Sequence, residues 1–371
     1  MSSAVVVGAG VFGASTAWRL ASDGWEVTLI DRWEPGHVRA SSGGESRLIR
    51  LGHASERYYQ RSAARSLELW TEIGRDAGAE LLVRSGVVWF ARHGDELVGR
   101  CEAALVEEGL PVERLTPAEA ARLFPDLATD DLEYAMHETT SGVLRARESV
   151  KALVGLAVAR GATLEIAEAR PDGRAVVLDD GRRLEADAVV WACGPWMGRL
   201  FPGVADVRAT RQEVLFFGAP AAWRTPSVPA WIENWECYGH GDLDGHGFKV
   251  GVDRLGEPFD PDTGRREQAA DAEPLARACL ARRFPSLADA PLIGVRVCQY
   301  ELTPDAHFLA AEHPEEPGVW LLGGGSGHGF KHGPALAEHL VAMIEGERAP
   351  EALFAAGPRA VGAAPSIGPH H

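Results

Sequence analysis

Hydrophobic residues near the start of the chain change their spacing twice. Ala4 to Val7 form a short apolar run, and the segment 11–22 then repeats small and apolar residues at helical intervals. A second apolar stretch, 25–31, ends in Asp31. This pattern predicts a strand, a helix and a second strand, which together make the βαβ unit of a parallel sheet.

Glycines occupy the turn between the first predicted strand and the helix. Gly8, Gly10 and Gly13 form the pattern GxGxxG. In this position they let the backbone approach a pyrophosphate at the helix N-terminus, and Asp31 stands about 20 residues later, where it can bond a ribose hydroxyl. The unit predicts a dinucleotide-binding domain, and by itself it leaves NAD and FAD open.

Beyond this unit, helical and strand-like segments alternate until about residue 206, after which strand-forming residues dominate. The alternating part predicts α/β structure and the later part a mostly antiparallel sheet, so two domains are expected to interleave. The other predicted elements are helices over 56–80, within 98–123 and over roughly 267–284, and a strand over 82–92.

Composition excludes some classes of partner. The chain has 371 residues and a net charge of −16, so it offers no basic face for nucleic acid or an anionic membrane. Its apolar runs are far shorter than the roughly 20 residues of a membrane span. The first residues lack the basic region of a signal peptide.

The five cysteines are widely spaced, and an odd number makes a poor disulfide framework. We therefore expect reduced thiols and a cytoplasmic location. No metal site is expected, because no CxxC or CxH pair occurs. The cysteines are Cys101, Cys193, Cys237, Cys279 and Cys298.

Three cations form candidate anion-binding groups. Arg47 and Arg50 follow a loop rich in serine and glycine, and their spacing puts both guanidinium groups on one side of a helical turn. A solvated basic surface is the alternative. Lys331 stands at the start of a predicted helix, where the helix dipole is already positive, so an anion is expected there.

Taken together, several motifs resemble the monomeric sarcosine oxidase and N-methyltryptophan oxidase branch of the D-amino-acid-oxidase superfamily of flavoproteins. The resemblance runs from Val5 to about Ile344. The matching stretches are "VVGAGVFGASTAWRLASDGWEVTLID", "SSGGESRLIR", "SGVL", "GPW", "GFKVG", "DPDT", "VCQY" and "GSGHGFKHG".

The resemblance implies an α/β protein in which a Rossmann-type FAD-binding domain is interleaved with an α+β substrate domain built on a large, mostly antiparallel sheet. The implied FAD-binding domain comprises residues 1–81, 141–205 and 303–345, and the substrate domain comprises 82–140 and 206–302. Residues 346–371 form the C-terminal tail, of which the Gly-, Pro- and Ala-rich stretch 355–371 is expected to be loose.

The resemblance also implies the residues that bind FAD. It suggests a covalent bond from the flavin 8α-methyl to Cys298, since a thiolate can attack that electrophilic carbon. On the local sequence alone, a buried core cysteine is the favoured interpretation of Cys298. The implied cofactor-binding residues are Gly8, Gly10, Val11, Phe12, Gly13, Asp31, Arg32, Ser41, Ser42, Ser46, Arg47, Arg170, Gly194, Trp196, Cys298, Gly327, His328, Gly329, Phe330 and Lys331.

Five positions match residues with catalytic or substrate-binding roles in the family. Lys249 matches the lysine that activates oxygen, although strand alternation alone does not decide which way its side chain points. Arg50 and Lys331 match the pair that holds the substrate carboxylate. Arg47 matches a position beside the flavin ring, and Tyr238 one that reaches into the substrate pocket.

Departures from the family pattern bear on the substrate. Ser42 and Gly43 stand where relatives carry two histidines, and Asp253 replaces an active-site histidine. A carboxylate there favours a substrate with a cationic group, and sarcosine itself is not expected. Trp231 and Trp235 either stack on an aromatic substrate or pack in the core.

These features predict an FAD-dependent amine oxidase. Its substrate is an amino acid or related secondary amine with a carboxylate, and its products are an imine and hydrogen peroxide. The alternatives are a flavin dehydrogenase that uses an acceptor other than oxygen and a flavin-carrying subunit without turnover. The resemblance implies a monomer.

Overall fold

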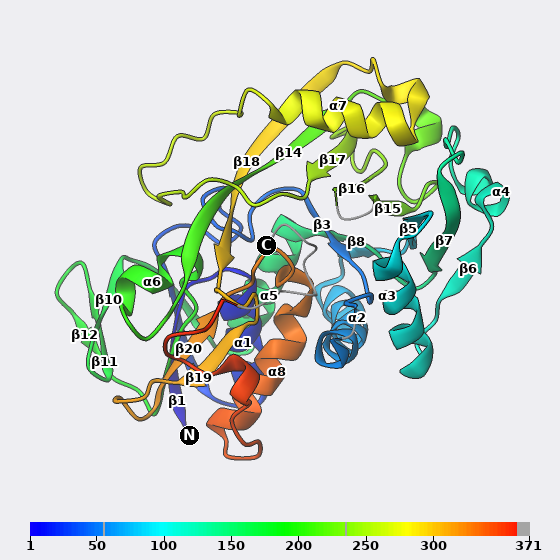
Figure 1. Ribbon diagram of the computed structural model, residues 1–371. Coiled ribbons are helices and arrows are strands. Elements are labelled where there is room, and N and C mark those ends of the chain that lie inside the picture. Colours follow the sequence, from blue (N-terminus) through cyan, green and yellow to red (C-terminus); the bar gives the residue numbers. More distant parts are fainter. Residues whose placement is uncertain (55, 234–235, 362–371) are drawn as a thin grey trace.

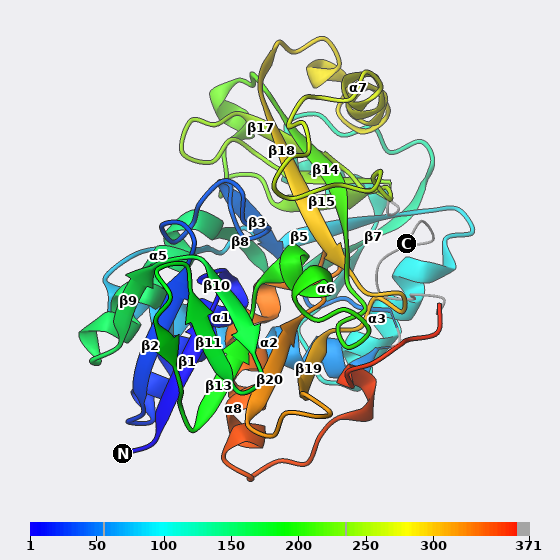
Figure 2. The same ribbon diagram turned by 90° about the vertical axis from the view of Figure 1, so that its left-hand side faces the viewer.

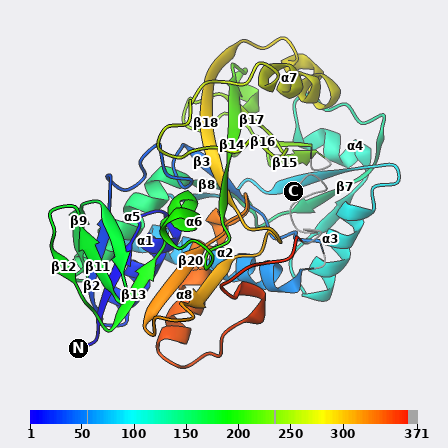
Figure 3. The ribbon, with the colours of Figure 1, turned by 60° about the vertical axis from the view of Figure 1, so that its left-hand side comes forward.

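The protein is described by a computed structural model that covers residues 1–54, 56–233 and 236–361. The described strands form two large sheets and two small ones. Figure 1 shows the first large sheet in the lower half of the molecule and the second above it. Two long strands, β14 (Arg208–Phe217) and β18 (Leu292–Leu302), run from the second sheet toward the first (Figure 3).

The first sheet has the strand order β19–β20–β13–β1–β2–β9, and all neighbouring pairs are parallel except β19–β20. This arrangement confirms the predicted βαβ unit and the Rossmann-type topology. Its strands are β1 (Ser3–Val7), β2 (Glu26–Asp31), β9 (Thr163–Ile166), β13 (Ala188–Trp191), β19 (Leu309–Glu312) and β20 (Val319–Gly323).

Both faces of the first sheet are covered, which explains the unbroken apolar run of β1. Val6 packs among the helices on one face, and Val5 and Val7 pack beneath a small sheet on the other. Figure 2 looks onto the side that carries the small sheet. The helices are α1 (Val11–Ser22), α2 (Arg57–Ala77), α5 (Ala146–Ala159) and α8 (Gly333–Ile344), and the small sheet is β10 (Ala169–Asp172), β11 (Ala175–Leu178) and β12 (Arg183–Leu184).

The second sheet has the order β18–β14–β17–β16–β15–β5–β7–β6 and is antiparallel except for the pair β15–β5. The helix α7 (Ala272–Arg283) lies along its outer face, at the top of Figure 1. The remaining strands of this sheet are β5 (Val87–Arg92), β6 (Glu113–Leu115), β7 (Leu132–Glu138), β15 (Ala230–Glu233), β16 (Cys237–His240) and β17 (Phe248–Val252).

The chain between the two large sheets forms another small sheet of β3, β8 and β4. The segment 98–123, predicted as helices, contains the strand β6 as well, and the predicted strand 82–92 is broken into β4 and β5. The elements are β3 (Ser46–Ile49), β4 (Leu82–Val83), β8 (Gly142–Arg145), α3 (Glu96–Glu107), α4 (Pro117–Ala120) and α6 (Met197–Leu200).

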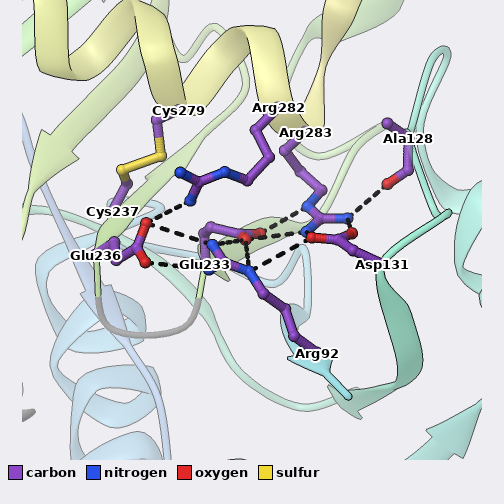
Figure 4. A network of polar contacts seen from close by, with 9 residues as sticks. All are labelled: Arg92, Ala128, Asp131, Glu233, Glu236, Cys237, Cys279, Arg282 and Arg283. Carbon is purple, nitrogen blue, oxygen red and sulfur yellow. Dashed lines mark hydrogen bonds and ion pairs between the residues drawn. A yellow bond between two sulfur atoms is a disulfide. The ribbon is translucent and has the colours of Figure 1, made fainter. Parts of the chain in front are cut away.

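A buried ionic network joins α7 to the second sheet (Figure 4). The side chains of Arg283 and Glu233 are both fully buried, and Arg283 Nε donates to Glu233 Oε2 at 2.6 Å. Arg283 also pairs with Asp131, while Arg92 pairs with Glu233 and Glu236. Each buried charge therefore has an opposite charge beside it, as burial requires.

Two expectations about the chain are wrong. Cys237 on β16 and Cys279 on α7 form a disulfide, because the packing of α7 brings together two residues 42 positions apart (Figure 4). The stretch 355–371 is not loose throughout: Arg359 donates to the backbone oxygen of Phe308 at 2.9 Å. Residues 362–371 of the tail lie outside the described residues.

None of the described helices combines the length and the apolar character that a membrane span needs.

Candidate active site

Two cavities lie where the large sheets meet. The glycine cavity, of about 150 Å³, is lined by the β1–α1 turn, the end of β2 and the loop after β13. The large cavity, of about 350 Å³, lies under the second sheet and is lined by side chains of β16, β17 and β18 and by the loop before α8.

The glycine cavity is shaped by close backbone packing. Gly8 has a φ of +103°, and a side chain there would lie 2.4 Å from the carbonyl oxygen of Ala192. Gly13 lies behind the cavity, where a side chain would collide with the carbonyl oxygen of Gly8. Only glycine permits this contact between the strand and the helix.

Asp31 lies at the edge of the glycine cavity, as the spacing predicts. Its Oδ2 accepts the Ala9 amide at 2.5 Å and its Oδ1 accepts the Trp33 amide at 2.9 Å. Burial raises the pKa of Asp31, although these amide hydrogen bonds oppose the rise. The other predicted residues that line this cavity are Gly10, Val11, Phe12, Arg32, Ser41, Ser42, Gly194 and Trp196.

The loop 41–46 separates the two cavities, and Arg47 holds it in place. One guanidinium nitrogen, Nη2, donates to the backbone oxygens of Ser41 and Gly43, both at 2.7 Å, and lies 3.7 Å from Cys298 Sγ. The hydroxyl of Ser42 accepts the Val11 amide at the start of α1. The loop therefore brings Cys298 of the large cavity next to the boundary with the glycine cavity.

Arg50 and Lys331 form a cationic wall of the large cavity. Both side chains are buried, and burial lowers the pKa of each. The Lys331 ammonium donates to the backbone oxygen of His328 at 3.0 Å, and the Arg50 guanidinium lies 5.1 Å from the centre of the Trp89 ring. The structure thus brings together the two residues that the sequence proposes as a carboxylate-binding pair.

Glu138 supplies negative charge behind this wall. It is fully buried and accepts hydrogen bonds from the amides of Leu51 and Gly52, at 2.6 and 3.0 Å, and from Trp89 Nε1 at 2.8 Å. The Ser141 hydroxyl donates to it at 2.5 Å. These hydrogen bonds fix the backbone immediately after Arg50 and therefore help to position its side chain.

Lys249 is the third cation of the large cavity. On β17, Phe248 and Val250 pack toward α7, so Lys249 points to the opposite side. Its ammonium donates to the backbone oxygen and to the hydroxyl of Ser46, at 3.0 and 3.1 Å. Burial, aided by the charge of Arg47, lowers the pKa of Lys249 to about 7.

His240 determines the direction of these hydrogen bonds. Its Nδ1 lies 2.6 Å from the carbonyl oxygen of Gly241, which can only accept, so Nδ1 carries the proton. Burial, followed by the charge of Lys249, lowers the pKa of His240 to about 3, so its Nε2 is a free acceptor. The Ser46 hydroxyl, 2.7 Å away, donates to Nε2 and offers its lone pairs to Lys249.

Tyr238 reaches into the large cavity because the strand beside it carries a glycine. Gly251 pairs with Tyr238, and a side chain at Gly251 would lie 2.5 Å from the ring. The Tyr238 and Tyr300 hydroxyls are 3.5 Å apart. Asp253 also lines this cavity, and its charge opposes the fall in the pKa of Arg50.

Comparisons with known proteins agree with this geometry. The family model described as FAD dependent oxidoreductase matches residues 3–343. The chain belongs to this family. It is 31% identical over 353 residues to the monomeric sarcosine oxidase of Bacillus sp. (strain B-0618). This match covers 91% of this chain and 90% of the relative.

Two other members extend the comparison. The N-methyl-L-tryptophan oxidase of Salmonella arizonae is 26% identical and is matched over 90% of this chain and 92% of its own length. The crystal structure of iminodiacetate oxidase from Chelativorans sp. BNC1 superposes with a TM-score of 0.78 at 25% identity, covering 96% of this chain and 100% of that chain.

The residues of the glycine cavity fit FAD, the cofactor of the family. The N-terminal turn of α1 lines this cavity beside Gly8 and Gly10, which suits a pyrophosphate. Asp31 stands where a ribose hydroxyl can bond its carboxylate. The large cavity beyond Cys298 has room for an aromatic ring next to Arg47.

Not every predicted site residue lines a cavity. Arg170 is exposed on β10, while its neighbours Ala167 and Ala169 face the glycine cavity, so strand alternation turns Arg170 away. Gly329 packs against Gly325, and Ser46 acts through Lys249. The remaining predicted residues, Gly327, His328 and Phe330, line the large cavity.

Trp231 and Trp235 are expected either to stack on an aromatic substrate or to pack in the core, and the structure decides between these for Trp231. Trp231 is fully buried and stacks on Phe248 with a ring distance of 5.9 Å, so it packs in the core beneath α7. Trp235 lies outside the described residues.

Sequence reasoning missed Glu138, His240, Glu301 and a histidine cluster. His53, His328 and His332 are buried, and their nearest ring nitrogens all lie within 4.8 Å of one another. Burial lowers the pKa of all three, so they are neutral. The neighbouring charges of Lys331 and Arg50 disfavour a metal ion among them. These residues come from chain segments that are far apart in the sequence, so no local motif predicts that they cluster.

Proposed function

We propose that the protein is an FAD-dependent oxidase that acts on the C–N bond of a secondary amine or amino acid carrying a carboxylate, with an imine and hydrogen peroxide as products. The observation that carries the proposal is the convergence of Arg50, Lys331 and Lys249 on the large cavity beside Cys298. Sarcosine, N-methyltryptophan and iminodiacetate, named for the relatives, are all secondary amines with a carboxylate.

Arg50 and Lys331 bind the substrate carboxylate. Both are cations removed from water, so a carboxylate that enters gains strong charge-assisted hydrogen bonds. Fixing this group orients the neighbouring C–H and amine in one direction within the cavity. Tyr238 limits the space on the side of the second sheet.

The same cations favour the neutral form of the bound amine. Arg47, Arg50, Lys249 and Lys331 all line the cavity, and nearby positive charges lower the pKa of an ammonium group. An amine that has lost its proton has a lone pair available when the C–H bond is oxidised, so no protein base is needed. Asp253 acts in the opposite sense and is proposed to favour substrates with a second cationic group.

FAD, when bound, supplies the two-electron acceptor for the substrate and returns the electrons to oxygen. The proposed role of Lys249 is to stabilise negative charge that develops on oxygen. Ser46 and His240 position Lys249 through the directed hydrogen bonds described above. Cys298 is the proposed point of covalent attachment.

Further assignments from the resemblance are part of this proposal. They include the cofactor-binding set given above and a monomer in solution. A cytoplasmic location, which does not come from the resemblance, is also proposed. The division into an FAD-binding domain (1–81, 141–205 and 303–345) and a substrate domain (82–140 and 206–302) is proposed as well. The comparisons do not favour a dehydrogenase or a subunit without turnover.

Acid precipitation of the purified protein tests the proposal. A yellow, fluorescent pellet is expected from the wild type and a colourless pellet with a yellow supernatant from Cys298→Ser. A panel of N-methyl amino acids, cyclic imino acids and their esters is then screened for peroxide release under air.

The outcomes separate the parts of the proposal. Flavin in the wild-type supernatant would contradict covalent attachment and leave FAD in place. Substrate-dependent flavin reduction without peroxide under air would contradict the oxidase and favour the dehydrogenase. Flavin in neither fraction would contradict the whole proposal.

A further inference from the structure

A buried carboxyl group that the proposed mechanism does not use lines the glycine cavity. Glu301, near the end of β18, is 8% exposed. Its side chain lies among glycines at the ends of two strands of the first sheet. A side chain at Gly194 would be 3.4 Å from Oε2, and one at Gly325 would be 3.0 Å from Oε1.

One oxygen of this carboxyl group has no protein partner. Among the described residues, no group forms a hydrogen bond with Glu301 Oε2, although it is shielded from solvent. The amides of Gly324 and Gly325 interact with the carboxyl group, and the ion pairs of the described residues do not include Glu301. A buried polar atom of this kind calls for a partner that is missing from the protein itself.

The charges around Glu301 are few. Burial raises the pKa of Glu301 to about 7, against the opposing effect of the two glycine amides. The other titratable groups that line this cavity are the Cys193 thiol, whose pKa is also raised by burial, and the side chains of Asp31, Arg32, Glu34, His37 and Glu168. Arg32 is exposed and pairs with Glu168 and Asp262, and no described cation forms an ion pair with Glu301.

We propose that Glu301 binds FAD as a neutral carboxylic acid, with Oε2–H donating a hydrogen bond to an oxygen of the pyrophosphate. The inference rests on the proposed FAD site. The first turn of α1, which suits a pyrophosphate, lines the same cavity, and Gly325 lies between Glu301 and the Phe12 ring of that turn. An ionised carboxylate would repel the phosphates, whereas the acid form donates to them.

This assignment predicts that FAD affinity falls with rising pH. The neutral form, which binds, predominates below pH 7 and is lost as the pH rises through the pKa. The dissociation constant should therefore increase about 30-fold between about pH 6 and about pH 8.5. A diester pyrophosphate does not titrate in this range, so the change reports the protein.

The experiment uses apoprotein of the Cys298→Ser variant, in which FAD binds reversibly. Flavin fluorescence quenching gives the dissociation constant for FAD, and calorimetry gives that for ADP-ribose, which has the pyrophosphate but no flavin ring. ADP-ribose also leaves the large cavity empty, so the titration of Lys249 does not enter its binding.

Glu301→Gln keeps a donor of similar shape and cannot ionise. It should bind FAD and ADP-ribose within about twofold of the parent at about pH 6 and show no weakening at higher pH. Glu34→Gln, which removes an exposed carboxylate at the same cavity, is the matched control and should keep the full pH dependence. Glu301→Leu, which lacks the donor, should bind both ligands more weakly at every pH.

Three results would overturn the inference: an unchanged pH slope in Glu301→Gln, undiminished affinity in Glu301→Leu, or a slope seen with FAD and absent with ADP-ribose. The last would exclude the pyrophosphate as the acceptor. If Glu301→Gln does not fold, as judged by its circular dichroism, the Leu variant decides. Failure of the parent to bind either ligand would overturn the proposed FAD site itself.

Discussion

Two regions of this molecule bury cations, and they differ in whether carboxylates neutralise the positive charge. In the network under α7, Arg283 donates to Glu233 and Asp131, and Arg92 lies beside the same carboxylates. Burial lowers the pKa of Arg92, but Glu236 and Glu233 outweigh it and the pKa is raised. In the large cavity the pKa of Lys249 is lowered instead.

The difference lies in the partners. Lys249 and Lys331 donate to neutral oxygens of Ser46 and His328, and neither forms an ion pair with a described carboxylate. The network is neutralised by the protein and holds α7 on the sheet. The cavity keeps part of its positive charge for a ligand, at a cost in stability that an entering anion offsets.

Among the changes proposed here, breaking the ionic network under α7 should have the largest effect on stability. Arg283→Met leaves Glu233 and Asp131 without their main partner, so the free energy of unfolding should fall by about 3–5 kcal/mol. Urea unfolding followed by circular dichroism measures it. Arg282→Met, next in the chain but with a side chain 39% exposed, should cost about 1 kcal/mol or less. Equal losses in the two variants would contradict the contrast drawn here.

Removing Lys249 should affect chemistry more than stability. Lys249→Met should slow the reaction of the reduced enzyme with oxygen by about 100-fold, a loss typical of one electrostatic group. Stopped-flow mixing of the reduced enzyme with oxygen isolates this step.

The pH dependence of the same step has a definite sign. Burial lowers the pKa of Lys249 to about 7, so the cation is present below that pH and is lost above it. The oxygen reaction of the wild type should slow as the pH rises through about 7, and Lys249→Met should show no such change. Lys249→Arg keeps the charge and should remain fast at high pH. A wild-type rate that rises with pH would exclude this role.

Lys331→Met should weaken substrate binding by about 10- to 100-fold, the loss of one hydrogen bond to a charged group. The weaker binding should appear as an increase in KM for a carboxylate substrate. For the methyl ester of that substrate the increase in KM should be small. Lys151→Met, on an exposed lysine of α5, is the control. The same loss for acid and ester would mean that Lys331 does not recognise the carboxylate.

Asp253→Asn should have the smallest effect, because this carboxylate is partly exposed to water. We expect a two- to fivefold drop in the preference for substrates with a second cationic group, measured as a ratio of kcat/KM values. An unchanged ratio would remove Asp253 from the recognition of charge.

Local patterns allowed much of the fold to be predicted. The strand, glycine turn and helix from Ser3 to Ser22 follow from spacing alone. The parts that failed depend on distant packing. Cys237 and Cys279 meet because α7 lies across the sheet, and Arg359 is held by the backbone of Phe308 next to β19.

The candidate site shows the same division. Family motifs identified the cations of the large cavity, whereas strand alternation could not tell which way Lys249 points until Phe248 and Val250 were seen under α7. Arg170 was assigned from its position and is turned outward by that alternation. Glu301 had no local signal, because only the meeting of three chain segments encloses it.

The strand order of the first sheet has a consequence for synthesis on the ribosome. β1 is made first, yet its neighbour β13 ends at Trp191 and the next strand, β20, ends at Gly323 of a 371-residue chain. Both neighbours of β1, which are β2 and β13, are available once Trp191 has been made, whereas β20 and α8 complete the sheet and its helical cover only near the end of the chain. Most of the lining of the glycine cavity is made by residue 200, and Glu301 of β18 completes it, so we expect the full cofactor site to form late in synthesis.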